Sequence, residues 1–556
     1  MAEKKTNKDV FADIAAERAQ DRGDLVEPRP QTVPSAVLPW NGRVCGPAGF
    51  SPRSRIQNKD DLSSELACIK ESFKPFLDRR APELESKRVA IRLEEFQWRL
   101  ETRADRCDFS RITKGMGRWK TVSIPHYGPP LGRATAYYRA EFTITRKMKS
   151  SKRLFLCFRG VDYRAHVFIN GSFLGSHEGF FAPFEFDFTE QSRTGKNVVA
   201  VKVENDAICM GNNSWGDDGQ EFEGDKIYAA TGPGYDDPEI GWHHCPPGMG
   251  IYQDVFIESR SEVFVHDLFV RPLLPENRAE AWLELWNCNI HRTRCRMEYS
   301  IFGENFEQTV CRKLQHVPEK PLGPGVNYFR INIDMSGCRQ WEPDSPWLYQ
   351  IHVRLIDDKD RVLDTAENVF GMRSFRMDTA NKPRGRMFLN GNEIRLRGAN
   401  TMGFEQQDVM QRDWNQLIDD ILLAKLCNMN FWRLTQRPVQ KEVYEYCNRL
   451  GLMTQTDLPL FGVLRRNQFC EAVRQAGEME RLVRSHPCNI MVTYINEPFG
   501  RAKGMPHRHL LRTELERFFM AADQAVLQSN PDRVIKAVEG DYDPPGPGLP
   551  DNHCYC

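Results

Sequence analysis

The sequence predicts a multidomain protein in which two β-sandwich domains precede a parallel α/β domain of the TIM-barrel type. Its 556 residues suffice for three or more domains of ordinary size. Between about residues 90 and 372, short apolar runs alternate with turn residues, which is typical of antiparallel sheets. Beyond residue 385, strand-like runs alternate with stretches of helical apolar spacing, which indicates βα units.

Residues 86–260 are predicted to form the first sandwich, after an N-terminal extension (residues 1–85) that is rich in charge, Pro and Gly and partly disordered. A short amphipathic helix is expected within that extension, near Leu62–Phe76. The strand patterns of the sandwich lie at 136–144, 153–158, 165–171, 197–203 and 251–257. A stretch rich in Gly, Asp and aromatic residues, 208–250, interrupts them, and loops of this length are usually functional or flexible.

Residues 261–373 are expected to form a second, smaller β-sandwich, and residues 374–556 the barrel. The strands expected in the smaller domain are 263–270, 281–286, 296–301, 328–333 and 349–356. In the barrel region, strands are expected at 394–398, 431–434, 452–456, 490–496 and 534–538, and helices at 414–426, 441–450, 470–484 and 510–528. Five strands joined by four helices predict a parallel sheet with right-handed crossovers, for which a (β/α)8 barrel is the usual host.

The amino-acid composition limits the classes of binding partner and cofactor that we expect. Lys+Arg and Asp+Glu both number 76, so net charge favours neither nucleic acid nor an anionic membrane. No apolar run is long enough for a membrane span, and the first residues lack the apolar stretch of a secretory signal. The 16 Cys are scattered without a C-x-x-C pair, which predicts free thiols and a cytoplasmic location. No cofactor motif is present, so we expect no cofactor, and a homo-oligomer stays open.

The most informative residue is Glu497, which follows the apolar run 490–495 and precedes Pro498. In a barrel of parallel strands, catalytic side chains project from the carboxyl ends of the strands. A carboxylate there can protonate a glycosidic oxygen, while the amide of Asn496 holds a sugar hydroxyl. The competing interpretation is an ordinary surface Glu at the start of a helix.

Several short runs, in this order and spacing, resemble the family 2 glycoside hydrolases, the group of β-galactosidases, β-glucuronidases and β-mannosidases. The resemblance covers roughly residues 110–556 and implies a jelly-roll sugar-binding-like domain, an immunoglobulin-like domain and a catalytic TIM barrel. The runs are Phe168-Ile169-Asn170-Gly171, Gly179–Phe184, Gly250-Ile251-Tyr252, Trp341–Tyr349, Phe370–Arg373, and Phe388–Asn400, the last resembling the first barrel strand.

The resemblance implies roles for individual residues. Glu497 matches the acid/base, Asn496 the residue that contacts the sugar 2-hydroxyl, and Arg433 the arginine that orients the nucleophile. Asp457 ends the third strand, where the family keeps an acidic residue that could bind sugar hydroxyls or support the barrel rim. Tyr555 falls near the expected sixth strand, where the family places a tyrosine beside the nucleophile.

The sequence also departs from the family pattern. Gln436 replaces the histidine of a Ser-His-Tyr-Pro-like run, and Asn400 is followed by Thr401 instead of a nearby histidine, so the sugar and linkage stay open. A retaining enzyme needs a second carboxylate about 5–5.5 Å from the acid/base. The family carries it on the seventh strand, whereas this sequence ends near the sixth, and Glu539 is expected to be a rim residue. We therefore expect the N-terminal portion of a longer enzyme, with about barrel strands 1–6.

The leading hypothesis is a retaining exo-β-glycosidase without its nucleophile segment. The alternatives are a non-catalytic carbohydrate-binding or structural protein, and an inactive fragment. Trp215 and Trp242, with Tyr235, are candidate sugar-stacking residues in the 208–250 stretch. The run His243-His244-Cys245 and the acidic residues between 217 and 225 suggest Zn²⁺ and Ca²⁺ ligands, but a solvated loop is the preferred interpretation, and no metal site is assigned.

Overall fold

The computed structural model describes residues 56–540, apart from 57, 128–133, 151–152, 206–207, 210–221, 224–225, 228–248, 382–384, 402 and 499–508. Its first element is helix α2 (Lys59–Leu77), which confirms the helix expected near residue 62. The side chain of Asn58 accepts hydrogen bonds from the backbone amides of Asp60 and Asp61 and so caps the helix. The buried face of α2, with Phe73, packs against α7 (Trp414–Leu426) and α8 (Lys441–Leu450) of the barrel region.

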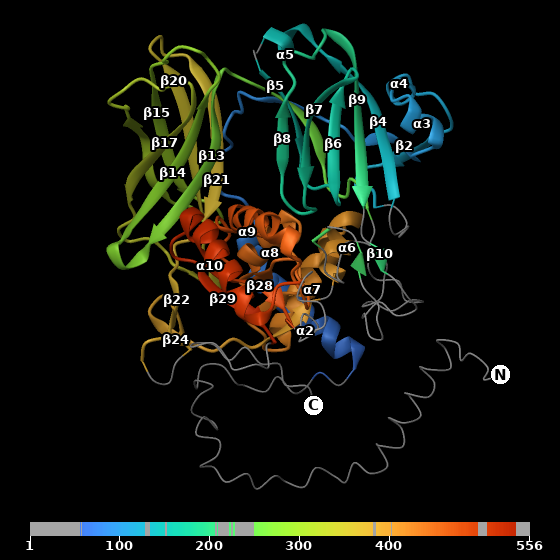
Figure 1. Ribbon diagram of the computed structural model, residues 1–556. Coiled ribbons are helices and arrows are strands. Elements are labelled where there is room, and N and C mark those ends of the chain that lie inside the picture. Colours follow the sequence, from blue (N-terminus) through green and yellow to red (C-terminus); the bar gives the residue numbers. More distant parts are fainter. Residues whose placement is uncertain are drawn as a thin grey trace, which may run out of the picture. The chain divides into compact units, whose positions relative to one another are not determined.

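The first sandwich consists of two antiparallel sheets, with strand orders β1-β12-β5-β8 and β3-β2-β4-β9-β6-β7 (Figure 1). Its fully buried core includes Tyr138, Ile169 and Val201. The Asn170-Gly171 pair has φ values of 51° and 88° and forms the tight turn predicted between β6 and β7. The elements are β1 (Val89–Arg92), β2 (Glu95–Leu100), α3 (Arg103–Cys107), α4 (Ser110–Thr113), β3 (Lys120–Ser123), β4 (Ala134–Ile144), α5 (Arg146–Ser150), β5 (Arg153–Phe158), β6 (Arg164–Ile169), β7 (Ser172–Glu178), β8 (Phe184–Asp187), β9 (Gly195–Asn205), the short pair β10 (Ile208–Cys209) and β11 (Phe222–Glu223), and β12 (Val255–Arg260).

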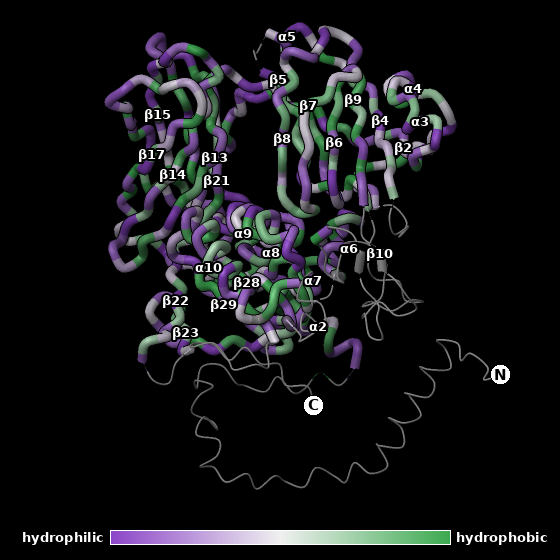
Figure 2. Tube along the Cα trace, in the orientation of Figure 1, coloured by the Kyte–Doolittle hydropathy of each residue, from purple (hydrophilic) through white to green (hydrophobic). Residues whose placement is uncertain are grey.

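The second sandwich pairs a sheet of order β13-β14-β17 with one of order β16-β15-β20-β21, as an immunoglobulin-like domain does. Along its strands, hydrophilic and hydrophobic residues alternate (Figure 2), which places one face of each sheet in the core. The elements are β13 (Val263–Leu273), η1 (Leu274–Glu276), β14 (Arg278–Asn287), β15 (Cys295–Gly303), β16 (Thr309–His316), β17 (Gly325–Asp334), β18 (Trp341–Glu342), β19 (Ser345–Pro346), β20 (Tyr349–Asp357) and β21 (Val362–Phe370).

Two residues from the motifs of this domain fasten it to the barrel. The indole of Trp341 is fully buried and donates to the carbonyl of Asn448 at 2.8 Å. The guanidinium of Arg373 donates to the carbonyls of Pro487 and Asn489, both at 2.9 Å. The family-like motifs here therefore have a structural function: they hold the amino-terminal side of the β-strand that leads to Glu497.

The first barrel strand, predicted at residues 394–398, is shifted along the chain and overlaps the prediction at Gly398 alone. The run Phe388–Asn400 does not form one strand; it contributes to the small sheet β22 (Phe375–Asp378), β23 (Arg386–Leu389) and β24 (Asn392–Ile394). Asn390 and Gly391 adopt left-handed φ values of 52° and 84°, so the chain turns between β23 and β24. The barrel begins only at β25 (Gly398–Thr401), where a Cβ on Gly398 would lie 2.0 Å from the carbonyl oxygen of Phe431.

The barrel region is a five-stranded parallel sheet of order β25-β26-β27-β28-β29, with helices packed around it (Figure 1). All eight residues of β28 are buried, as expected for a parallel strand covered on both faces. Five consecutive parallel strands with crossover helices form part of a TIM barrel. The elements are α6 (Phe404–Gln411), α7 (Trp414–Leu426), β26 (Phe431–Leu434), α8 (Lys441–Leu450), β27 (Met453–Asp457), η2 (Arg466–Gln468), α9 (Phe469–Val483), β28 (Asn489–Asn496), α10 (Arg512–Ser529) and β29 (Val534–Glu539).

Within the described ranges, no helix combines the length and the apolar content that crossing a membrane requires. Eleven cysteines in the same ranges are free thiols.

Candidate active site

Three polar side chains meet at the carboxyl ends of neighbouring barrel strands. Arg433 on β26 donates through Nε and Nη2 to Oδ2 of Asp457 on β27, at 2.9 and 2.5 Å. The same Nη2 donates to Oδ1 of Asn496 on β28 at 2.6 Å. Three residues that are far apart in the sequence therefore form one hydrogen-bonded group, as the sequence-based assignment of the site requires.

Burial makes this group rigid. Arg433 is 4% exposed, Asn496 3% and Asp457 0%. Besides Arg433, the carboxylate of Asp457 accepts hydrogen bonds from the backbone amide of Gln436 at 3.0 Å and from Nε2 of Gln455 at 3.1 Å. A buried carboxylate is tolerated only when its oxygens are paired in this way. Asp457 thus anchors Arg433 at the ends of the strands.

Glu497 follows β28 in an unusual backbone conformation. Its φ is 47°, in the left-handed region that non-glycine residues seldom occupy, and the residue is 8% exposed. Its amide donates to the carbonyl of Glu539 at 2.7 Å. The preceding residue, Asn496, is held by backbone hydrogen bonds with Leu460 and Gly462. Such outliers cluster at functional sites, where the surrounding structure enforces them.

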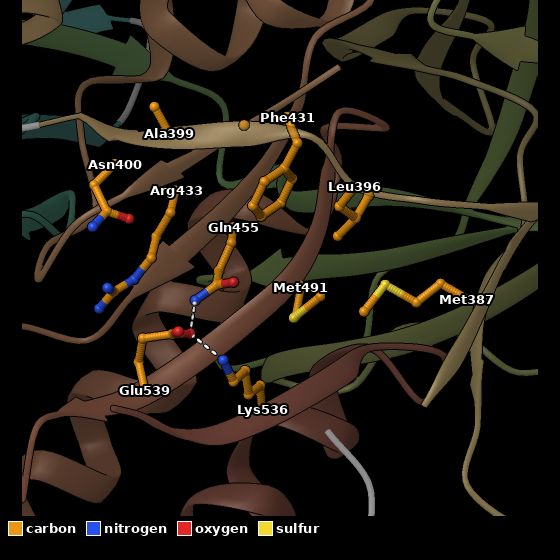
Figure 3. A pocket seen from close by; sticks show the side chains of 11 residues that line it. Met387, Leu396, Ala399, Asn400, Phe431, Arg433, Gln455, Met491, Lys536 and Glu539 are labelled. Carbon is orange, nitrogen blue, oxygen red and sulfur yellow. Dashed lines mark hydrogen bonds and ion pairs between the residues drawn. The ribbon is translucent and has the colours of Figure 1, made fainter. Parts of the chain in front are cut away.

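A cavity of about 340 Å³ opens on the inner face of the sheet beside these residues (Figure 3). Its polar lining contains Arg433, Gln455, Lys536 and Glu539, and Figure 3 shows both Gln455 and Lys536 directed at the Glu539 carboxylate. Those two contacts measure 3.1 and 2.6 Å. Glu539, which was expected to be a rim residue, is the last residue of β29 and lines this cavity. The remaining lining residues are Met387, Leu396, Gly398, Ala399, Asn400, Phe431 and Met491.

Gln436, the residue that departs from the family pattern, is also part of the site. Its φ of 60° turns the chain just after β26, and its backbone amide reaches Asp457. The side chain is 5% exposed, and its Oε1 has no hydrogen-bond partner among the described residues. Next to it, Arg437 and Glu405 form a fully buried ion pair of 3.0 Å. Glu405 comes from α6, a helix that the sequence patterns did not reveal.

The insertion between β9 and β12 is fastened at residues 226 and 227. The ammonium of Lys226 donates to Oδ1 of Asp162 at 2.5 Å, inside the protein, and the Asp162 carboxylate also accepts from the Tyr127 hydroxyl at 2.9 Å. The carbonyl of Lys226 accepts from Nε2 of Gln468, next to the loop that follows β27. The insertion is thus attached both to the sandwich and to the barrel mouth.

Other predicted site residues cannot be placed. Trp215, Trp242, Tyr235 and Tyr555 lie outside the described residues, as do the run His243-His244-Cys245 and the acidic residues between 217 and 225.

The fold and the site define a class of protein: a carbohydrate-active enzyme scaffold in which two β-sandwiches precede a parallel α/β barrel. Three profiles of one family match this chain in the corresponding order. They are the glycosyl hydrolase 2 galactose-binding domain-like profile at residues 130–229, the glycosyl hydrolases family 2 profile at 263–373, and the family 2 TIM barrel domain at 382–510. The chain belongs to glycoside hydrolase family 2.

Known relatives agree with this membership. A β-galactosidase of Priestia megaterium is 26% identical over 406 residues, which cover 68% of this chain and 35% of that protein. The chain thus spans about a third of that curated relative's length. Among solved structures, a Bacteroides uniformis β-glucuronidase aligns with a TM-score of 0.63 at 19% identity, covering 81% of this chain and 52% of that one. A β-D-mannosidase from Dictyoglomus thermophilum gives 0.64 at 17% identity, covering 84% and 60%. At these identities the structures support the fold alone.

Proposed function

We propose that the protein is a retaining exo-β-glycosidase in which Glu497 is the acid/base. The observation that carries the proposal is the buried Arg433–Asp457–Asn496 group, which is hydrogen-bonded at strand ends directly beside Glu497. The protein also belongs to a glycosidase family and matches that family's barrel domain, which supports the same class of reaction.

In the proposed reaction, Glu497 protonates the glycosidic oxygen as the bond to the aglycone breaks, while a second carboxylate attacks the anomeric carbon. Glu497 then removes a proton from the water that hydrolyses the glycosyl-enzyme. Asn496 hydrogen-bonds the 2-hydroxyl of the sugar. Its Oδ1 accepts from Arg433, which leaves the amide NH₂ group as the donor toward the substrate.

The second carboxylate is assigned to a part of the protein outside the described residues. At the carboxyl ends of the described strands, Asp457 is paired with Arg433 and Glu539 with Lys536. Asp457 is completely buried, and Glu539 is held by both Gln455 and Lys536, so neither carboxylate is assigned the attack on the sugar. The family resemblance implies that Arg433 orients the incoming nucleophile.

Sugar specificity is assigned in part to Gln436. Its buried Oε1 accepts no hydrogen bond from the described residues, so it can take one from a sugar hydroxyl beside Asp457. A site with such an unsatisfied acceptor favours a sugar whose hydroxyl donates to it over a sugar that lacks this hydroxyl. This preference can be larger than the preference that an apolar contact gives. Galactosides, glucuronides and mannosides are the classes to compare.

The test uses the native gene product that carries residues 1–556, assayed on nitrophenyl and phenyl β-glycosides of these three sugars. We expect Glu497→Gln to lower kcat/KM for the phenyl glycoside by about 10²–10⁴-fold, the usual contribution of a general acid. In Glu497→Ala, azide should restore turnover of the nitrophenyl glycoside and form a β-glycosyl azide, because the small anion enters the space of the lost carboxylate. Glu445→Gln, on the exposed face of α8, is the control.

Equal phenyl glycoside rates in the wild type and Glu497→Gln contradict the assignment of Glu497. An α-configured azide product contradicts the assignment of Glu497 as the acid/base of a retaining enzyme. Sugar binding without hydrolysis of any of these glycosides supports the alternative, a non-catalytic carbohydrate-binding protein.

A further inference from the structure

A series of hydrogen bonds around the site begins and ends at two consecutive residues. The peptide bond between these two residues closes the series into a ring. One end is the side chain of Asn496, and the other is the backbone amide of Glu497. They are tied to different strands of the sheet: Asn496 to β26, two strands away, and Glu497 to the adjacent strand β29. The peptide bond between them is therefore held from both edges of β28.

On one side, the ring runs through two buried residues. Asn496 accepts from Arg433 at 2.6 Å, and Arg433 donates to Asp457 at 2.9 and 2.5 Å. This half of the ring contains residues that the sequence analysis singles out as candidate site residues.

On the other side, the ring runs through residues to which the sequence assigns no such role. Nε2 of Gln455 lies 3.1 Å from Oδ1 of Asp457 and 3.1 Å from Oε2 of Glu539, so one amide group spans the two carboxylates. It also lies 2.8 Å from Oγ1 of Thr493. The carbonyl of Glu539 then accepts the amide of Glu497 at 2.7 Å, which closes the ring.

Lys536 supplies the positive charge of this second half. Its ammonium lies 2.6 Å from Oε2 of Glu539, and the two side chains are 11% and 12% exposed. Figure 3 shows the pair projecting from β29 into the cavity. Two carboxylates joined by one amide repel each other, and Arg433 neutralises only Asp457. Without Lys536, the largely buried carboxylate of Glu539 would lose the positive charge beside it, which weakens its place in the ring.

We propose that Lys536 and Glu539 are positioning residues for the acid/base: they hold Glu497 in its left-handed backbone conformation and thereby aim its carboxylate. This inference rests on the proposed role of Glu497, but the geometry that it invokes is independent of activity. The competing explanation is a purely structural pair that fills the interior of the barrel. The positioning role and the purely structural role predict different effects when the pair is lost. They differ in the hydrogen exchange of the Glu497 amide and in the rate of proton donation to the leaving group.

The first test measures hydrogen exchange in the native gene product, with single-amide resolution across residues 494–498. In Lys536→Met, the Glu497 amide should exchange roughly ten- to a hundredfold faster, which is the effect of losing a charge-supported hydrogen bond. Lys536→Arg should restore most of the protection. The control is Lys441→Met, which removes the same side chain from an exposed ion pair of 2.8 Å with Glu445. Unchanged exchange at Glu497 in Lys536→Met overturns the inference, whatever the activity.

The second test uses leaving groups. A mispositioned acid/base slows the departure of a poor leaving group, which needs protonation, more than that of a good one. In Lys536→Met, kcat for a phenyl glycoside should fall by more than about tenfold and that for a dinitrophenyl glycoside by less than about threefold, with KM little changed. A purely structural pair predicts equal losses for both substrates, and that result overturns the inference.

Glu497→Ala, measured on the same substrates, separates the two proposals. If Glu497→Ala shows the leaving-group dependence and Lys536→Met does not, the positioning role fails alone. If Glu497→Ala lacks it too, the proposed function fails first.

Discussion

The replacement of Arg433 by Met tests how strongly the site depends on its buried ion pair. The variant removes both hydrogen bonds to Oδ2 of Asp457 and the one to Asn496. Asp457 is completely buried, so its carboxylate would keep only the Gln436 amide and Gln455 as donors. Breaking a buried pair from one side costs about 3–5 kcal/mol. With a urea dependence of about 2 kcal/mol per M, the unfolding midpoint should fall by about 1.5–2.5 M.

The assay is hydrogen exchange of the β26, β27 and β28 peptides as a function of urea, because these peptides report on the barrel apart from the two sandwiches. The double variant Arg433→Met/Asp457→Leu should recover most of the lost stability, since it removes the orphaned charge, yet it should stay inactive. Arg474→Met, from an exposed ion-pair cluster on α9, should cost less than about 1 kcal/mol. A midpoint shift below 0.5 M for Arg433→Met (about 1 kcal/mol at that urea dependence) refutes the reasoning.

Three further predictions concern pH and the insertion. Burial lowers the pKa of His486 to about 4, below its ordinary 6.5, so its contribution to stability is lost as pH falls through this window; His486→Gln should flatten the decline in Tm between pH 6.5 and 4. Burial and the neighbouring Asp420 raise the pKa of Asp408 to about 7 from 3.8, so its contribution is lost as pH rises; Asp408→Asn should raise Tm at pH 8 and change it little below pH 4. Lys226→Met should destabilise the junction of the insertion by about 3 kcal/mol in urea, and Lys226→Met/Asp162→Leu by less, because the double variant leaves no unpaired carboxylate.

The helical and short-strand patterns of the barrel were the most predictable part of the fold. The bounds of α7, β26 and α8 agree with the expected 414–426, 431–434 and 441–450, because amphipathic spacing and strand length are local properties. The first barrel strand was expected at 394–398 but lies at 398–401, because the Asn390-Gly391 turn folds residues 392–394 back onto β23.

The site was predictable where a residue type at a strand end identified it. Arg433, Asp457 and Asn496 were each singled out from the sequence, and the structure joins them by hydrogen bonds; their catalytic roles stay predictions. Gln455 and Lys536 could not be found in this way. Strands buried on both faces lose the alternation that shows which residues point inward, so the direction of these side chains depends on tertiary packing. The Asn-Glu-Pro run gave no sign of the left-handed backbone at Glu497 either.

The attachment of Lys226 to Asp162 also changes the loop-closure entropy of the insertion between β9 and β12. Asp162 holds Gly250 through two backbone hydrogen bonds and Lys226 through its side chain, so it fixes two points of the excursion between β9 and β12. One long closure is thereby replaced by two shorter ones. Since closure entropy rises only slowly with length, at about 0.6 kcal/mol per doubling, either segment could lengthen or shorten at little cost. The segments on either side of Lys226 can therefore diverge in length and sequence independently of each other.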